Sequence, residues 1–371
     1  MLAPLATVLR EWGRIGVIGF GGPPVHVALL RELCVERRGW LDAREFEDAN
    51  AACGLLPGPA STQLAIFCAR RVAGLRGAIV GGLAFVLPGL VLLLALAVVS
   101  LRDDPPALVR GAAAGAGAAV MIVVLQAGVK LLGPALAPRP GGSRARAAAS
   151  AAAGAVATVV VGPLVVLVLL GCGLLELGLR RRPAAPPGAA ALHAATLPAL
   201  VWTAFKVGAL SYGGGFVIIP LMQADAVDAY GWMTQAEFLN AVALGQITPG
   251  PVTQTVGAVG YAAAGLGGGI LAAAVAFLPS FLIVGLGADR FERLRGSASA
   301  RAFLDGAGPA AIGAILGAAV PLADGLGESW QLAVLAVAAV ALLALGRGTM
   351  PVLLAAAAAG ALVGAGGGPL P

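Results

Sequence analysis

Four long apolar runs stand out in the pattern of hydrophobic and polar positions, at residues 77–100, 107–133, 269–288 and 303–322. The runs are rich in Ala, Leu, Val and Gly and lack the polar alternation of a strand, so they predict helices. Each is long enough as a helix to cross the roughly 30 Å of hydrocarbon in a bilayer. The pattern therefore predicts an all-α polytopic membrane protein.

Shorter segments complete the predicted path through the membrane. Residues 5–30 are expected to cross inward as a first membrane element rather than to form a removable signal peptide, because charged residues interrupt the stretch and no small-residue cleavage site follows. The arms at 45–56 and 60–73 are too short to span the bilayer, so they predict a re-entrant hairpin that turns at Pro57-Gly58-Pro59. Residues 147–178 predict two further short segments.

The chain contains an internal duplication. The turn Pro57-Gly58-Pro59 recurs 192 positions later as Pro249-Gly250-Pro251, and Gly21-Gly22 recurs as Gly213-Gly214 at the same offset. Rare residues that coincide in one order indicate two related halves. The predicted organisation is an N-terminal repeat at 1–182, a proline-rich linker at 183–194 and a C-terminal repeat at 195–371.

The basic residues predict that the two repeats are inserted in opposite senses. Loops that carry Arg and Lys in the first half have counterparts without them in the second half, and after the next helix the bias reverses. Because basic loops stay on the cytoplasmic side, this predicts inverted-topology repeats. The basic stretches are 31–44, 70–76, 130–146 and 290–301, and their counterparts are 223–237, 261–268, 321–329 and 101–106.

Composition agrees with a membrane protein and argues against a nucleic-acid partner. Hydrophobic residues make up 59% of the chain, charged residues make up 11%, and the mean hydropathy is +0.93. A soluble chain keeps roughly a quarter of its residues charged, so most of this surface is expected to face the lipid bilayer. The basic residues behind the net charge of +6 lie mostly in short loops, which is the positive-inside distribution and not a nucleic-acid-binding face.

The sequence predicts no metal site, no cofactor and no nucleotide hydrolysis. The four cysteines form no C-x-x-C pair and the chain has two histidines, so a tetrahedral metal site is not expected. The phosphate-binding motif G-x-x-x-x-G-K-[ST] does not occur either. An integral-membrane enzyme acting on a lipid phosphate stays a remote alternative, because the acids form no convergent set for metal or general-base chemistry.

Four helix-breaking motifs are candidates for a substrate site. They are the two glycine pairs and the two Pro-Gly-Pro turns, and non-helical backbone at membrane depth is tolerated where it lines a cavity or is buried in protein. A helix that restarts after a break presents N–H groups and the positive end of its dipole, which favours an anion. Hydroxyl and amide donors follow both turns and suit an oxygen-rich ligand, namely Ser61, Thr62, Gln63, Thr253, Gln254 and Thr255.

Arg14 and Lys206 are the candidate cations. They occupy the same repeat position inside apolar helices, where a cation is costly and commonly functional, unless it snorkels to the interface. We therefore predict an anion site near the bilayer midplane, where the glycine breaks approach the turns. The predicted binding residues are Arg14, Gly21, Gly22, Pro57, Gly58, Pro59, Ser61, Thr62, Gln63, Lys206, Gly213, Gly214, Pro249, Gly250, Pro251, Thr253, Gln254 and Thr255.

Other polar residues have structural interpretations. Glu45 and Glu237 begin the predicted short arms, where a carboxylate favours a helix N-terminus. His26 is expected to pack rather than to relay protons, because its repeat counterpart is Ile218. Small-residue stretches such as GAAAGAGAA from Gly111 allow close helix approach, either within the chain or in a homodimer.

These motifs resemble those of the chromate transporter family in its long, two-domain form. The resemblance covers essentially the whole chain, through FGGPPVHVALL, RRGWLDAREF, LLPGPASTQLA and AFVLPG and their counterparts GGGFVIIPLM, GWMTQAEF, GQITPGPVTQT and AFLPSF. It implies a secondary transporter that exports chromate across the bacterial inner membrane and gives chromate resistance, with sulfate as an analogue. Uptake or exchange of sulfate or another inorganic anion is the alternative that the sequence leaves open.

Overall fold

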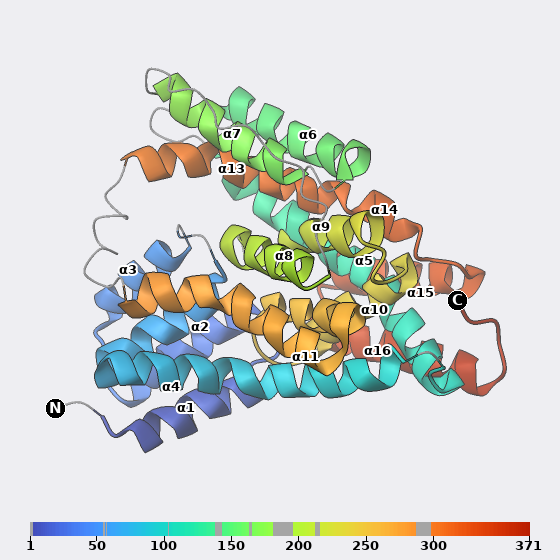
Figure 1. Ribbon diagram of the computed structural model, residues 1–371, viewed down its shortest axis with the longest axis horizontal. Helices are drawn as coiled ribbons and strands as arrows, with labels where there is room; N and C mark the ends of the chain where they lie inside the picture. Colours follow the sequence, from blue (N-terminus) through green and yellow to red (C-terminus); the bar gives the residue numbers. More distant parts are fainter. Residues whose placement is uncertain are drawn as a thin grey trace.

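The computed structural model consists of helices and their connections (Figure 1). It describes residues 3–371 except Leu55, Pro57, Asp103, 138–142, 163–164, 181–195, 212–215 and 287–297. No strand occurs among the described residues, in agreement with the predicted all-α class. The predicted linker at 183–194 lies outside the described residues.

A similar order of helices occurs in both halves of the chain. The first half contains α1 (Leu5–Ile18), α2 (Pro23–Arg31), the π-helix η1 (Glu32–Arg37), α3 (Ala43–Cys53), α4 (Ala60–Ser100), α5 (Ala107–Ala135), α6 (Arg144–Val160) and α7 (Val165–Arg180). The second half contains α8 (Thr196–Leu210), α9 (Ile218–Gln223), η3 (Ala224–Ala229), α10 (Gln235–Ile247), η4 (Val252–Gln254), α11 (Thr255–Ser280), η5 (Phe281–Leu286), α13 (Ala298–Gly317), α14 (Ala319–Ala323), α15 (Ser329–Ala339), η6 (Val340–Ala344) and α16 (Thr349–Ala365).

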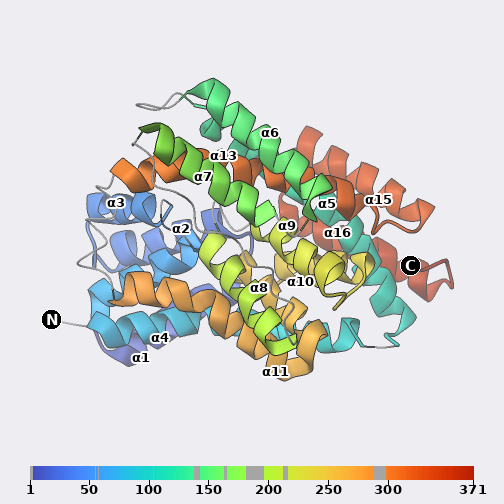
Figure 2. The same ribbon diagram turned by 45° about the horizontal axis from the view of Figure 1, so that its top comes forward.

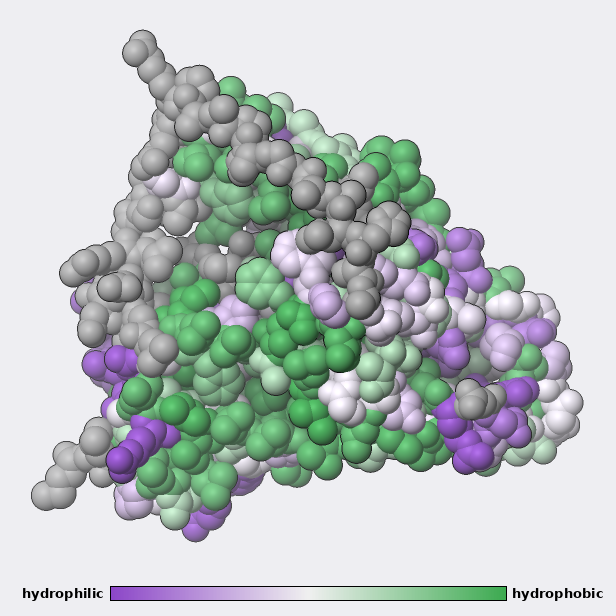
Figure 3. Space-filling model, viewed as in Figure 1, coloured by the Kyte–Doolittle hydropathy of each residue, from purple (hydrophilic) through white to green (hydrophobic). Residues whose placement is uncertain are grey.

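Four helical segments are long and apolar enough to cross a membrane. They are Ala60–Ser100, Ala107–Ala135, Val252–Gly285 and Ala302–Ala323, and each contains all or most of one predicted apolar run. Figure 3 shows hydrophobic residues over the middle of one face, with hydrophilic residues gathered towards its left and right ends. Length, composition and surface all agree with a multi-pass membrane protein.

The helices α4 and α11 each contain a sharp reversal. Gly74 in α4 has φ 66° and ψ −160°, and Gly265 in α11 has φ 62° and ψ −159°. A positive φ of this size favours glycine, because a β-carbon would clash with the backbone. After the reversal the two arms of α4 pack together, since any side chain on Gly81 would overlap Ala69. The first arm matches the predicted short arm, and the second matches the predicted spanning run.

Residues 5–30 do not cross inward as the sequence predicts. The N–H of Ala3 donates to the carbonyl of Val72 at 3.0 Å, and Arg38 pairs with Glu11 at 2.5 Å. The chain therefore turns back at the glycine break, and both ends of this segment lie near the same end of the molecule. The physical reason is length, because the 14 residues of α1 reach only about 21 Å as a helix.

The long arms of α4 and α11 run antiparallel. Gly82 lies against Phe281, whereas Leu94, twelve positions later in α4, lies against Gly269. The carbonyl of Gly285 also accepts a hydrogen bond from Arg70, near the reversal of α4. Equivalent helices of the two halves therefore point in opposite directions at the centre of the molecule.

The apolar core joins the two halves rather than separating them. One cluster combines residues of α1 to α4 with Phe277 and Val284, and the other combines Leu90 and Leu93 with α5 and much of the second half. In Figures 1 and 2, α6, α7 and α13 lie side by side along one edge, away from α1. Each half thus completes the core of the other.

Small residues bring α5 and α16 close together. Gly111 and Gly115 face Gly360 and Ala356, where a larger side chain would overlap the neighbouring backbone. The stretch from Gly111 that the sequence marks for close helix approach is therefore covered within the chain. A homodimer stays a prediction, and it would have to use other surfaces than this stretch.

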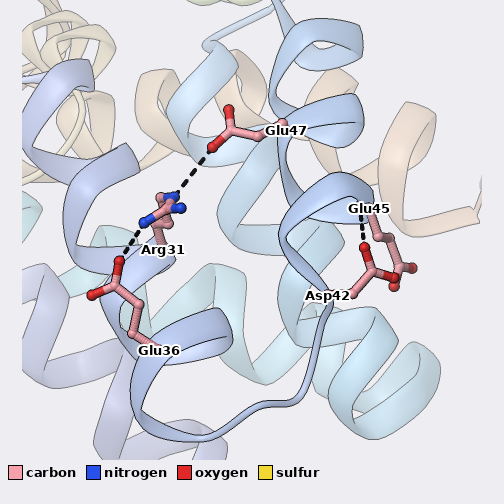
Figure 4. Close-up of polar contacts among 5 residues, drawn as sticks. All are labelled: Arg31, Glu36, Asp42, Glu45 and Glu47. Carbon is pink, nitrogen blue, oxygen red and sulfur yellow. Dashed lines mark hydrogen bonds and ion pairs between the residues drawn. The ribbon is translucent and has the colours of Figure 1, made fainter.

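Polar contacts fix the connection between α2 and α3 (Figure 4). Arg31 forms an ion pair with Glu36, and its Nε donates to Glu47 of α3 at 3.2 Å. The N–H of Glu45 donates to Oδ1 of Asp42 at 2.8 Å, which caps the start of α3. Glu45 therefore lies in the first turn of a helix, as its position in the sequence predicts.

Candidate functional site

The first glycine break is a non-helical corner between α1 and α2. Gly21 and Gly22 have φ angles of 106° and 74°, in the region that favours glycine. Pro23 begins α2, where its missing N–H costs no helical hydrogen bond. Within the described part of the chain, neither Gly21 nor Gly22 donates its N–H to a backbone carbonyl. These donors are therefore open to a ligand.

His26 links this break to the first Pro-Gly-Pro turn. Its Nε2 lies 2.8 Å from the carbonyl oxygen of Gly19, and because a carbonyl can only accept, Nε2 carries the proton. Nδ1 of the neutral ring then accepts from the hydroxyl of Ser61, 3.1 Å away. The same Gly19 carbonyl accepts the N–H of Gly250 at 3.0 Å. One carbonyl therefore contacts the second turn directly and the first turn through His26.

The second half has a shorter version of this link. The Oγ of Ser211, the repeat counterpart of Gly19, lies 3.3 Å from Oγ1 of Thr253, the counterpart of Ser61. Ile218 stands where the first half has His26, so a direct hydroxyl contact replaces the imidazole bridge. The predicted site residues Gly213 and Gly214 lie outside the described residues.

Each Pro-Gly-Pro turn packs against the long helix of the other half. A side chain on Gly58 would come within 2.9 Å of the hydroxyl of Ser280 in α11, and a side chain on Gly89 of α4 would overlap the carbonyl of Pro249. Gly89 and Ser280 are repeat counterparts, so the two turns have equivalent surroundings. Of the other predicted turn residues, Pro59 and Pro251 are buried and Pro57 lies outside the described residues.

The predicted donors after the two turns are all buried, each at most 2% exposed, namely Ser61, Thr62, Gln63, Thr253, Gln254 and Thr255. Some are used inside the protein, since Gln254 Nε2 donates to the Pro249 carbonyl at 2.8 Å. In the described structure, Thr62 Oγ1, Gln254 Oε1 and Ser280 Oγ have no hydrogen-bond partner. Because buried polar atoms are normally paired, water or ligand atoms are expected beside them.

A cavity of about 530 Å³ opens beside the first glycine break. Gly21, Gly22 and Val252 line it, so it lies between the first break and the second Pro-Gly-Pro turn. Sites for small ligands usually have volumes of roughly 300–1,000 Å³. Helices α2, α3, α5, α10 and α16 supply the other walls, and both halves of the chain therefore contribute.

The lining of this cavity is mostly apolar, and its few polar groups favour an anion. Its polar side chains are those of Asn50, Gln126, Lys130, Gln246 and Thr349. Lys130 is the one charged residue among the described lining residues, and none of these is acidic. The Nε2 of Gln246 is buried and has no hydrogen-bond partner in the described part of the chain. A cation together with amide, hydroxyl and backbone donors suits negatively charged oxygen atoms.

The two predicted cations lie elsewhere. Arg14 is exposed on α1 and does not line the cavity. Lys206 is 6% exposed, and its Nζ lies 2.7 Å from Oδ1 of Asp225. The other oxygen of that carboxylate accepts from the hydroxyl of Thr203 at 2.6 Å. In this structure Asp225 balances the charge of Lys206, and this pairing was not predicted from the sequence.

The polar lining of the cavity was not predicted from the sequence. Lys130 is counted there in a basic stretch, whereas the residue lies within α5. Gln246 interrupts a short, mostly apolar arm, and that polarity is a signal that could have identified it, whereas Asn50 follows Glu47 and Asp48 in a polar arm and gives no such signal. Thr349 gives no such signal, because its place in the cavity depends on how α16 packs against α5.

Comparisons with known proteins relate the chain to one family. The family model described as Chromate transporter matches residues 6–177 and 198–365. The "Chromate transport protein" of Cupriavidus metallidurans is 34% identical over 89% of this chain and 85% of its own length. The protein of that name from Pseudomonas aeruginosa is 30% identical, over 84% and 79% respectively. No solved structure matches the chain significantly.

Proposed function

The chain belongs to the chromate transporter family, and from that premise we propose that it is a secondary carrier that exports chromate across the bacterial inner membrane and gives chromate resistance. The transported species is a tetrahedral divalent oxyanion. The family is one of transporters, so we assign no enzymatic activity. No part of the proposal requires a cofactor or a resident metal ion.

One observation carries the proposal, and it is the cavity beside the Gly21–Gly22 break. It has space for a small oxyanion, donors from both halves of the chain, one lysine and no acid among its described lining residues. An oxyanion in this cavity accepts from the N–H groups of Gly21 and Gly22 and lies next to the second turn. Lys130 supplies the cation there, and the proposal does not need Arg14.

The antiparallel helices support a carrier built from inverted repeats. The long arms of α4 and α11 oppose each other, and the contacts of Gly89 and Ser280 with the opposite turns are equivalent. The family model also matches the chain in two regions. In transporters of this architecture the substrate lies near the bilayer midplane at the repeat interface, between broken helices. Rocking of the two halves around such a site gives alternating access.

The charge of the neighbouring segments supports a cavity that opens to the cytoplasm. Lys130 lies in the last turns of α5, next to the basic stretch 130–146, and Thr349 follows Arg347 at the start of α16. Basic loops remain cytoplasmic, so both ends are assigned to that side. The membrane potential then favours export, by roughly 4–5 kcal/mol for two charges at about 100 mV.

The test is direct transport in membrane vesicles of known orientation. Inside-out vesicles that contain the chain are expected to accumulate labelled chromate when the interior is made positive, and right-side-out vesicles whose interior is negative, as in the cell, are expected not to accumulate it. Vesicles from cells without the protein give the background. Saturable uptake of sulfate with no uptake of chromate would contradict the proposal and establish the alternative, a carrier for sulfate or another inorganic anion.

A further inference from the structure

We infer that Lys130 and Gln246, one from each half of the chain, are the side chains that recognise the oxyanion in the cavity. This inference rests on the proposed function, because it names residues of the same site. Neither residue follows from the glycine breaks or the Pro-Gly-Pro turns. Both line the cavity beside Gly21 and Gly22.

Lys130 is a cation whose charge is available to a ligand. No ion pair of Lys130 occurs within the described part of the chain, whereas Lys206 is paired with Asp225 and Arg146 with Glu176. Lys130 is an exposed residue, and its ammonium group stands at the end of a flexible four-carbon side chain. The geometry therefore gives Lys130 a place at the mouth of the cavity, where a single positive charge attracts an anion without holding it rigidly.

Gln246 is a donor in the wall of the cavity. Its Nε2 has no partner in the described structure and is covered by the surrounding protein, so a turn of the side-chain amide is needed to bring it to the cavity surface. Gln126, which also lines the cavity, differs because its Nε2 already donates to the carbonyl of Leu342 at 3.1 Å. A buried amide donor without a partner is unfavourable until an acceptor arrives. An oxygen of the bound anion supplies that acceptor.

The repeat supplies no equivalent of these two residues in the opposite half of the chain. The counterpart of Gln246 is Gly54, and the second-half counterpart of the stretch 130–146 contains no Lys or Arg. Lys130 and Gln246 therefore have no equivalent in the opposite half, and both line the described cavity.

This site distinguishes ligands by charge and by acceptor oxygens. A lysine and an amide donor without a neighbouring acid repel inorganic cations and give a neutral solute no advantage. The ammonium group is a point charge without a fixed fork, so it does not discriminate strongly among tetrahedral oxyanions. We therefore expect chromate, sulfate and molybdate to compete for it, with their affinities depending on Lys130 and Gln246 alike.

The first experiment measures initial rates of labelled chromate uptake into inside-out vesicles against chromate concentration. Lys130→Gln is expected to raise KM by roughly tenfold, the loss typical of one contact with a charged group, and Lys130→Arg to stay within about threefold of the parent. Gln246→Glu places a like charge beside the anion and is expected to abolish uptake. Arg110→Gln is the matched control, because it removes a charge from an exposed position of α5 outside the cavity.

A second variant keeps the test independent of folding. In a Cys172→Ser background the remaining native cysteines are buried, so Lys130→Cys is the accessible thiol. A cationic thiol reagent is expected to restore low KM to the same preparation, and an anionic reagent to raise KM further. Equal effects of the two reagents, or equal KM values in Lys130→Gln and Arg110→Gln, would overturn the inference.

Failure of the proposed function gives a different result from failure of the inference. If the parent vesicles transport none of the three oxyanions, the proposed function fails. Equilibrium binding of labelled chromate to the purified protein then decides the inference, which stands if Lys130→Gln weakens binding by about tenfold and falls if it does not. If the parent transports chromate and the variants match it, only the inference fails.

Discussion

The two lysines of the chain have opposite environments, although both lie within helices. Lys206 is buried and paired with Asp225, while Lys130 is exposed at a cavity without an acidic neighbour among its described lining residues. Burial removes a charge from water at a cost that only a close partner offsets. Lys206 therefore depends on Asp225, and its interaction with an anion would require that pair to open. Lys130 can contact an anion without the opening of an ion pair.

Removal of the Asp225 carboxylate is expected to destabilise the protein strongly. Asp225→Asn leaves the buried ammonium of Lys206 without a counter-charge, which costs about 3–5 kcal/mol in comparable buried pairs. Unfolding of the purified protein in detergent, followed against temperature and denaturant, measures the loss. Glu36→Gln is the control, because its pair with Arg31 is solvent-exposed and is expected to change stability by at most about 1 kcal/mol.

The companion double variant separates the pair from the fold. Lys206→Met with Asp225→Leu removes both charges and is expected to recover most of the stability lost in Asp225→Asn, because apolar residues of similar size can replace a buried pair. Equal stability of Asp225→Asn and the parent would show that the ion pair contributes nothing to the fold.

At the scale of elements, glycines set how closely the second turn approaches α4. Gly89 leaves no room for a side chain against the backbone carbonyl of Pro249, which is itself held by the Gln254 amide at 2.8 Å. A backbone carbonyl in a fixed turn cannot move aside as a flexible side chain can. A methyl group at position 89 would therefore increase the distance between α4 and this turn.

Gly89→Ala is expected to displace the turn from α4 and to lower stability by about 1–3 kcal/mol, the usual cost of overpacking. Chromate transport should fall as well, because the turn borders the cavity. Gly171→Ala is the matched control, since this glycine lies in α7 and a β-carbon there would meet no atom within 4 Å outside its own helix and its chain neighbours. That change is expected to be neutral or to stabilise by up to about 1 kcal/mol through helix propensity. Equal behaviour of the two variants would rule out the tight contact.

The sequence predicts helices much better than it predicts how they fold back. The long runs in α4, α5, α11 and α13 follow from apolar length alone, which is a local property. The capping role expected of Glu237 also holds, since it forms a capping box with Thr234 at the start of α10. The return of residues 5–30 was missed although the short length of α1 is a local property, and contacts such as Arg38 with Glu11, which the sequence does not reveal, hold the returning segment in place.

The candidate site was likewise only partly predictable from the sequence. Glycine pairs and Pro-Gly-Pro turns are visible as local breaks, and Gly21 and Gly22 do line the cavity. Lys130 and Thr349 could not be assigned to it from the sequence, because they reach it only through the packing of α5 against α16. Residues that reach a binding site through tertiary packing have no recognisable sequence motif.

For the whole molecule, the two halves form one body. Each Pro-Gly-Pro turn rests on the long helix of the opposite half, and both apolar clusters draw residues from both halves. A change of access in such a molecule must alter both turn contacts together, because the turns share the Gly19 carbonyl through Gly250 and His26. Because the halves are linked in this way, the carrier architecture depends on how the two halves are oriented relative to each other in the membrane.

The charge bias of the loops predicts that orientation, with residues 290–301 in the cytoplasm and residues 225–237 in the periplasm. The antiparallel course of α4 and α11 supports the assignment, because their equivalent ends then face opposite sides. Single cysteines at Asp228 and Ser299, in a Cys172→Ser background, are to be treated in whole cells with a membrane-impermeant maleimide. Asp228→Cys is expected to react in intact cells and Ser299→Cys only after permeabilisation. Reaction of both in intact cells, or of neither, would place the two stretches on one side of the membrane. The inverted repeat, and with it the carrier architecture proposed from the antiparallel helices, would then be wrong.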